Sequence, residues 1–164
     1  MSNGKFIDDE QARVDAIAAR LRDGKAADEI PQFNRYTNRV VYQIGQQELP
    51  EIVGTIDTYV TPQTVELLQE VDAVGREIIA KHGMGSDQDI FVLFGADFGD
   101  GKPGVAYRGP ITDYWMTVDS VAPDGERMSW DCLKEIKRTL KRDYNIGAFV
   151  FDVTTKPPAT TCWE

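Results

Sequence analysis

The sequence is poor in the residues from which most catalytic and metal sites are built. Its 164 residues include one histidine, His82, and two cysteines, Cys132 and Cys162. A single histidine leaves little room for a histidine-based metal site or a Ser-His-Asp triad. A chain of this length can bury a core without disulfides, so both cysteines are expected to be free thiols. We predict no metal site and no cofactor.

The sequence also lacks a long apolar run. The longest stretches, such as Ile90–Phe94, are far shorter than the ~20 residues that a membrane-spanning helix needs. The N-terminal residues reach the acidic Asp8 without the apolar segment of a secretion signal. The expectation is a cytoplasmic protein without a membrane segment.

Cations are scarce in the middle of the chain. Lys and Arg number 5 against 14 Asp and Glu in residues 51–128, whereas they number 7 against 8 in residues 1–50 and 6 against 5 in residues 129–164. The middle therefore carries the excess behind the net charge of −9. This charge argues against direct nucleic-acid binding and favours a partner protein with a basic surface. The oligomeric state stays open.

Three helices are predicted, each from a capping residue followed by apolar residues at helical spacing. Asp8 with Gln11, Thr61 before Pro62, and Ser129 supply the N-terminal signals. The predicted helices cover residues 8–23, 62–82 and 129–144. His82, the histidine at the end of the second helix, is expected to act as a helix-end cation.

Strands are predicted between and after these helices, at Val40–Gly45, Glu51–Val60, Ile90–Gly95, Val105–Arg108, Asp113–Val121 and Gly147–Val153. The C-terminal half then has the order β-β-β-α-β. The predicted fold is a single α+β domain over residues 1–164, with a mainly antiparallel sheet packed against three main helices.

A glycine-rich segment, Phe94–Gly109, contains a formal GxGxxG match from Gly99 to Gly104. A dinucleotide-binding loop needs a helix directly after its glycines, but Pro103 and a predicted strand follow here. Asp97 and Asp100 would also repel a phosphate. We interpret the segment as a hairpin connection whose glycines take positive φ and whose aspartates cap nearby N–H groups.

The basic residues of the third predicted helix recur at positions that share one face. A solvated helix exterior explains this pattern, and contact with an acidic partner or a nucleic-acid backbone is the alternative. These residues are Lys134, Lys137, Arg138, Lys141 and Arg142.

The segment SWDCLKEIK, Ser129–Lys137, resembles a W-[D/E]-x-L-x-x-I-K element of small uncharacterised phage and bacterial proteins. The matching positions are Trp130, Asp131, Leu133, Ile136 and Lys137. The resemblance implies a phage or bacterial origin and no particular activity.

The leading functional prediction is a non-enzymatic acidic binding protein, of the inhibitor, immunity or anti-defence kind, which docks on a basic surface of a partner protein. Phe98 would serve as an apolar anchor beside four carboxylates. The predicted contact residues are Asp97, Phe98, Asp100, Asp113 and Asp119.

Two alternatives stay open. The first is a metal-dependent nuclease or phosphodiesterase with a ribonuclease H-like order of elements, in which Asp97, Glu135 and Asp152 would hold the metal. The second is a small-ligand-binding protein that uses the glycine-rich segment against Tyr114 and Trp115.

Overall fold

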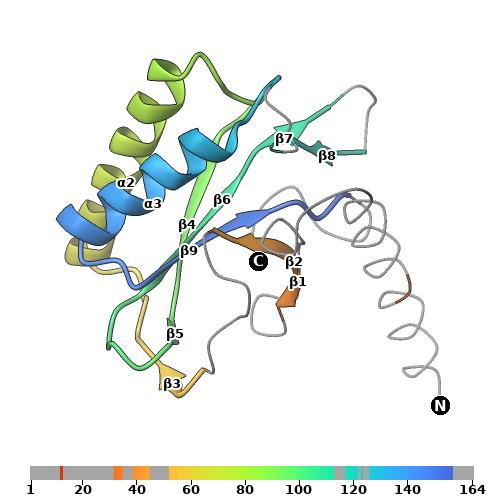
Figure 1. The fold of residues 1–164 in the computed structure, drawn as a ribbon. Helices are drawn as coiled ribbons and strands as arrows, with labels where there is room; N and C mark the ends of the chain where they lie inside the picture. Colours follow the sequence, from red (N-terminus) through yellow and green to blue (C-terminus); the bar gives the residue numbers. More distant parts are fainter. Residues whose placement is uncertain are drawn as a thin grey trace.

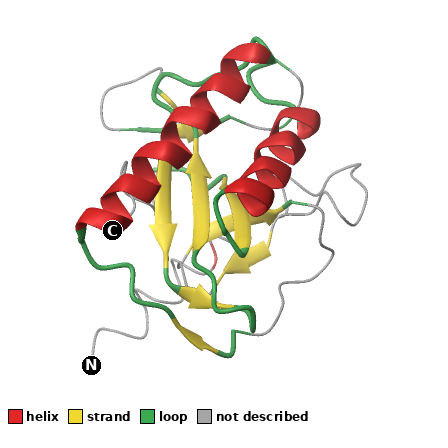
Figure 2. Cartoon of the chain, turned by 90° about the vertical axis from the view of Figure 1, so that its left-hand side faces the viewer, coloured by secondary structure: helices red, strands yellow, loops and turns green. Residues whose placement is uncertain are grey.

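The protein has a five-stranded sheet with two helices on one face (Figures 1 and 2). The structure, a computed structural model, describes residues 12, 32–34, 39–44, 52–112, 117–121, 123 and 126–156. In chain order its elements are β1 (Gln32–Asn34), β2 (Arg39–Gln43), β3 (Gly54–Thr55), α2 (Pro62–Lys81), β4 (Ile90–Phe94), β5 (Ala96–Asp97), β6 (Gly104–Arg108), β7 (Pro110–Ile111), β8 (Asp119–Ser120), α3 (Trp130–Asp143) and β9 (Ala148–Asp152).

The main sheet is mixed, with the strand order β1-β2-β9-β6-β4. Neighbouring strands run antiparallel except for β6 and β9, which are parallel and are joined by a connection that contains α3. A parallel pair needs such a long crossover, and a helix normally provides it. Every residue of β6 and β9 is buried, as expected for central strands covered on both faces. Two short pairs, β3-β5 and β7-β8, lie outside the main sheet.

Helix α2 begins where the sequence predicts. The Thr61 side chain accepts a hydrogen bond from the Thr64 N–H, the Thr64 hydroxyl accepts one from the Thr61 N–H, and Pro62 occupies the first helical position. Gly75 faces the sheet, where a Cβ atom would lie 2.3 Å from the Phe91 ring. The missing side chain therefore lets α2 pack closely against β4.

Helix α3 is amphipathic and packs beside α2. Ser129 caps it by accepting a hydrogen bond from the Cys132 N–H at 3.2 Å. Its buried face is the apolar stripe Cys132, Leu133, Ile136 and Leu140. This stripe packs in the main core with inward-facing residues of the central strands, such as Tyr107 and Phe151, so the basic residues of α3 are left on its outer face.

The structure confirms the α+β class. It describes two of the three predicted helices, because the helix predicted over residues 8–23 falls outside the described residues apart from residue 12; the prediction of three main helices is not supported. One predicted strand is much shorter than expected, because only Gly54–Thr55 forms a strand within the described part of residues 51–60. Of the strand predicted over residues 113–121, the described residues 117–121 contain the strand Asp119–Ser120, and residues 113–116 lie outside the described residues.

Candidate functional site

A buried ion pair joins the three central strands on the face of the sheet opposite the helices. Asp152 at the end of β9 accepts a 2.8 Å hydrogen bond from Nη1 of Arg108, the residue paired with it on β6. Arg39 Nη1, on β2, lies 3.8 Å from the same carboxylate. Side chains alternate along each strand, so these charges point away from the aromatic core that faces the helices.

This centre is closed to solvent. The Arg108 and Asp152 side chains are 0% exposed. Arg108 Nη1 also donates to the Thr154 carbonyl at 2.7 Å, whereas its Nε and Nη2 have no hydrogen-bond partner among the described residues. Asp152 is thus the carboxylate that makes burial of the Arg108 cation tolerable. Because no part of the pair reaches the surface, we assign it a structural role.

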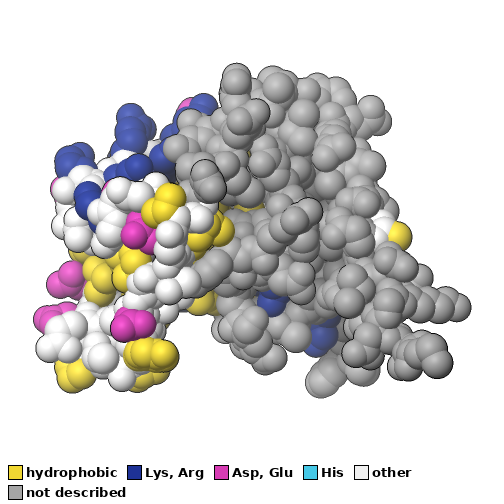
Figure 3. Space-filling view, turned by 90° about the horizontal axis from the view of Figure 1, so that it is seen from below, with side chains coloured by type: hydrophobic (Ala, Val, Ile, Leu, Met, Phe, Trp, Pro, Cys, Tyr) yellow, Lys and Arg dark blue, Asp and Glu magenta, His cyan; other side chains and the backbone are white. Residues whose placement is uncertain are grey.

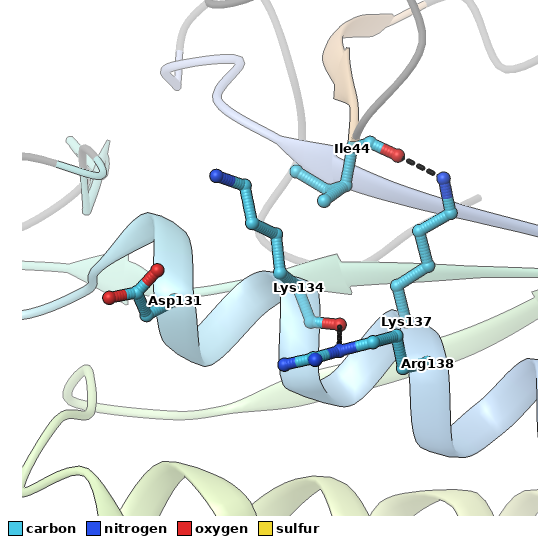
Figure 4. A pocket seen from close by; sticks show the side chains of 5 residues that line it. All are labelled: Ile44, Asp131, Lys134, Lys137 and Arg138. Atoms are coloured by element: carbon cyan, nitrogen blue, oxygen red, sulfur yellow. Dashed lines mark hydrogen bonds between the residues drawn. The ribbon is translucent and has the colours of Figure 1, made fainter.

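An open pocket of about 440 Å³ lies on the outer face of α3 (Figure 4). Among the described residues, Ile44, just after β2, forms one wall, and Asp131, Lys134, Lys137 and Arg138 also line the pocket. Figure 4 shows the Lys134 and Lys137 side chains extending from the helix toward the side on which Ile44 lies. The Arg138 side chain folds back along the helix, where its Nε donates to the Lys134 carbonyl at 3.3 Å.

Lys137 links α3 to the end of β2. Its Nζ donates a hydrogen bond to the Ile44 carbonyl and is only partly exposed. Burial, and to a lesser extent the nearby charge of Lys141, lower the pKa of Lys137 below its ordinary value. An anion in the pocket would relieve both effects, because it would stabilise the charged form of the lysine.

The basic residues predicted to share one helix face do share it. Three of the five line the pocket, and Lys141 and Arg142 continue the row toward the end of α3. Arg142 pairs with Asp143, but Lys134, Arg138 and Lys141 form no ion pair with any carboxylate of the described residues. On the face that Figure 3 shows, most of the visible Lys and Arg side chains gather at one edge of the described surface and a few lie apart from them, whereas most of the visible Asp and Glu lie outside this basic group.

A second charged junction holds the two helices together. Glu135 of α3 accepts hydrogen bonds from Lys81 Nζ at 2.6 Å and from His82 Nε2 at 2.8 Å. Both partners lie at the C-terminal end of α2, so His82 is at the helix end, as predicted. The hydrogen bonds from Lys81 and then His82 lower the pKa of Glu135 to about 2.

The glycine-rich segment is a capped turn, as the sequence indicates. Gly99 and Gly101 have positive φ, and Asp97 Oδ1 accepts hydrogen bonds from both of their N–H groups at 2.8 and 3.0 Å. Asp100 accepts one from the Lys102 N–H. Phe98 is half-buried against the second apolar cluster of the sheet.

Two further predicted contact residues remain, Asp113 and Asp119. Asp119 is exposed in β8, and Asp113 lies outside the described residues, as do Tyr114 and Trp115 of the small-ligand alternative. Docking on a partner protein therefore stays a prediction.

The structure places the three carboxylates of the nuclease alternative in different environments. Asp97 caps a turn, Glu135 pairs with two cations between the helices, and Asp152 is enclosed beside Arg108. No group of three or more His, Cys, Asp or Glu side chains in the described ranges could hold a metal ion.

The described cysteine is a core residue. Cys132 is free and fully buried, and burial raises the pKa of its thiol to about 11. Cys162 lies outside the described residues. Among the helices that the structure describes, none combines the length and apolar character needed to cross a membrane.

Comparison with known proteins relates the chain to GMP synthases. A protein of Lacticaseibacillus casei (strain BL23) named GMP synthase (glutamine-hydrolyzing) is 37% identical over 112 residues, which cover 64% of this chain and 21% of that protein. Proteins of the same name from Lacticaseibacillus rhamnosus and Streptococcus pyogenes serotype M1 are 36% and 33% identical over the same length. The chain thus spans about a fifth of the length of the curated relatives it matches. No protein-family model matches it.

Sequence reasoning missed two features of these sites. Ile44 lines the pocket although it is distant in sequence from α3, and only the tertiary structure brings it there. The pairing of Arg108 with Asp152 left a clearer signal: two strongly apolar strands, GVAYR and AFVFD, end in opposite charges. Charges in strands that are buried on both faces must be paired.

We expect Asp152→Asn to destabilise the fold more than Arg108→Met. The first change leaves the fully buried Arg108 without the carboxylate that it pairs with, and should lower the free energy of unfolding by about 3–5 kcal/mol. The second leaves Asp152 with Arg39, so its effect should be smaller. Urea unfolding of both variants measures the difference, and an equal or larger loss for Arg108→Met would refute this assignment.

The contacts of Glu135 with Lys81 and His82 should make the free energy of unfolding fall as the pH is lowered below 4.5. The Glu135 carboxylate has an ordinary pKa of 4.5 and one of about 2 in the folded protein, so its contribution is complete above pH 4.5 and is lost as the pH falls toward 2. Glu135→Gln should therefore flatten the decline in unfolding free energy over this range. Urea midpoints at several pH values test this, and parallel profiles for the two proteins would count against it.

Proposed function

We propose that the chain is a non-catalytic, nucleotide-binding counterpart of one segment of GMP synthase. The observation that carries this proposal is the 37% identity over 112 residues to a GMP synthase (glutamine-hydrolyzing) of which the chain spans about a fifth. The 112 matched residues thus correspond to one part of a much longer enzyme. GMP, the nucleotide in the name of these relatives, is the ligand that the proposal assigns.

The described residues favour binding over catalysis. Hydrolysis of an amide through a covalent intermediate needs an activated nucleophile, such as a thiolate beside a base. Cys132 has the opposite environment, since its thiol is enclosed in the core and its pKa is raised to about 11. His82 is held at the end of α2 by Glu135 rather than beside a nucleophile.

The charge of the α3 pocket supports a phosphate-bearing ligand. Among the described residues that line it, Lys134, Lys137 and Arg138 are cations, although the chain as a whole carries a net charge of −9. Lysine binds phosphate as a compact point charge, and arginine binds it through parallel N–H donors. The volume of about 440 Å³ lies within the usual range for small-molecule sites.

GMP should stabilise the protein against heat. A ligand present at 100 times its dissociation constant adds about 2.7 kcal/mol to the free energy of unfolding. For a chain of this size that corresponds to a rise in Tm of roughly 5–10 °C. Thermal unfolding with GMP, AMP and guanosine measures the shift, and AMP and guanosine should give less. The absence of a shift at millimolar GMP, or equal shifts with all three compounds, would contradict the proposal.

Docking on a basic partner protein is a second proposal, supported by exposed apolar side chains, of which that of Val53 lies beside the acidic turn. Val53, Tyr59 and Val60 are 64%, 75% and 91% exposed, and Val53 lies next to Gly99. The partner class is the GMP synthase-type enzyme itself. Sedimentation of the chain with purified Lacticaseibacillus casei GMP synthase tests this proposal. The Asp100→Lys variant should form a weaker complex whose stability depends less on salt. The absence of a complex at low salt would rule the proposal out.

A further inference from the structure

The α3 pocket has opposite charges at its two ends. Asp131 lies in the first turn of the helix and Lys137 lies six residues further on, which places their backbones about 9 Å apart along the axis. Lys134 stands between them, and Ile44 forms the apolar wall (Figure 4). A ligand that fits this arrangement carries hydrogen-bond donors at one end, a flat apolar surface in its middle and an anionic group at the other end.

A guanine nucleotide has this pattern. Its base presents an N1–H and an exocyclic N2 amino group side by side, and a carboxylate can accept hydrogen bonds from both. Its faces are apolar enough to lie against an isoleucine and the aliphatic stem of a lysine. Its phosphate carries a charge of about −1.5 to −2 at neutral pH.

We infer that the α3 pocket binds a guanine nucleoside monophosphate, with Asp131 accepting from the guanine edge and Lys134 and Lys137 binding the phosphate. This inference rests on the proposed function for the identity of the ligand, and it goes further by assigning the site and its selectivity. Adenine has no N1–H and no N2 amino group, so Asp131 is the residue that would distinguish GMP from AMP.

The groups that the ligand would contact are available. Asp131 and Lys134 are exposed and form no ion pair with the described residues. The Lys137 ammonium donates one of its three hydrogen bonds to the Ile44 carbonyl, and this bond fixes its position at the pocket. Its other two N–H groups can donate to the phosphate. Arg138 is held to the helix through Nε and keeps its two terminal nitrogens for the ligand.

Isothermal titration calorimetry of the full chain with GMP, IMP, AMP, guanosine and inorganic phosphate tests the inference. Asp131→Asn should weaken GMP binding by about 10-fold to 100-fold and remove most of the preference over IMP, which lacks the N2 amino group. Lys134→Ala should weaken GMP binding by about 10-fold while leaving guanosine binding unchanged. Lys141→Ala is the matched control, because it removes one charge from the same helix face outside the pocket, and it should bind GMP like the unaltered chain.

The possible results separate the site from the function. If the chain binds GMP and all three variants bind it equally well, the pocket assignment is wrong and the proposed function stands. If the chain binds inorganic phosphate through Lys134 but shows no preference for GMP over AMP, the guanine assignment fails together with the proposed function. Thermal unfolding of each variant without ligand verifies that a loss of binding is not a loss of fold.

Discussion

The arrangement of the sheet depends on one carboxylate. Asp152 ends the central strand β9 and contacts arginines from both neighbouring strands, Arg108 at 2.8 Å and Arg39 at 3.8 Å. A one-residue slip of either neighbour would turn its arginine to the face that carries the aromatic core, and would leave a charge without its partner. The ion pair therefore specifies the register of the parallel β6-β9 pair. That pair in turn requires the crossover in which α3 lies.

Helix α3 then has two faces with different tasks. Its apolar stripe belongs to the core, so the helix cannot rotate without exposing Leu133 or Ile136. The opposite face presents a row of cations in a chain with a large excess of acidic residues. Two contacts hold α3 in place. Glu135 pairs with Lys81 and His82 at the C-terminal end of α2, and Lys137 donates a hydrogen bond to the Ile44 carbonyl just after β2. The outer face is thus held rigid, as a binding site requires.

Much of the local structure could be predicted from the sequence, because its causes are local. The caps at Thr61 and Ser129, the start of each helix and the capped turn after Asp97 depend on residues within a few positions of one another. The predicted strands were less accurate where tertiary contacts decide the outcome. Residues 51–60 alternate well enough to suggest a long strand, but the pairing with β5 covers only Gly54 and Thr55.

The candidate site could be predicted only in part. The basic face followed from helical spacing, whereas the pocket needs Ile44, which the fold brings from another part of the chain. The carboxylates chosen for a metal site lie on three elements whose relative positions no sequence pattern gives. Asp131 gave no sign of a binding role in the sequence, because an acidic residue in the first turn of a helix is already explained by its favourable interaction with the helix dipole.

The most direct test of this account is an NMR titration of the ¹⁵N-labelled chain with GMP, which reports where the nucleotide binds without altering any residue. The account predicts that the amide signals of residues 130–138 and of Ile44 shift together and saturate, while those of β6 and β9 around Arg108 change little. Shifts confined to the Arg108 end of the sheet, or to the glycine-rich turn, would contradict it.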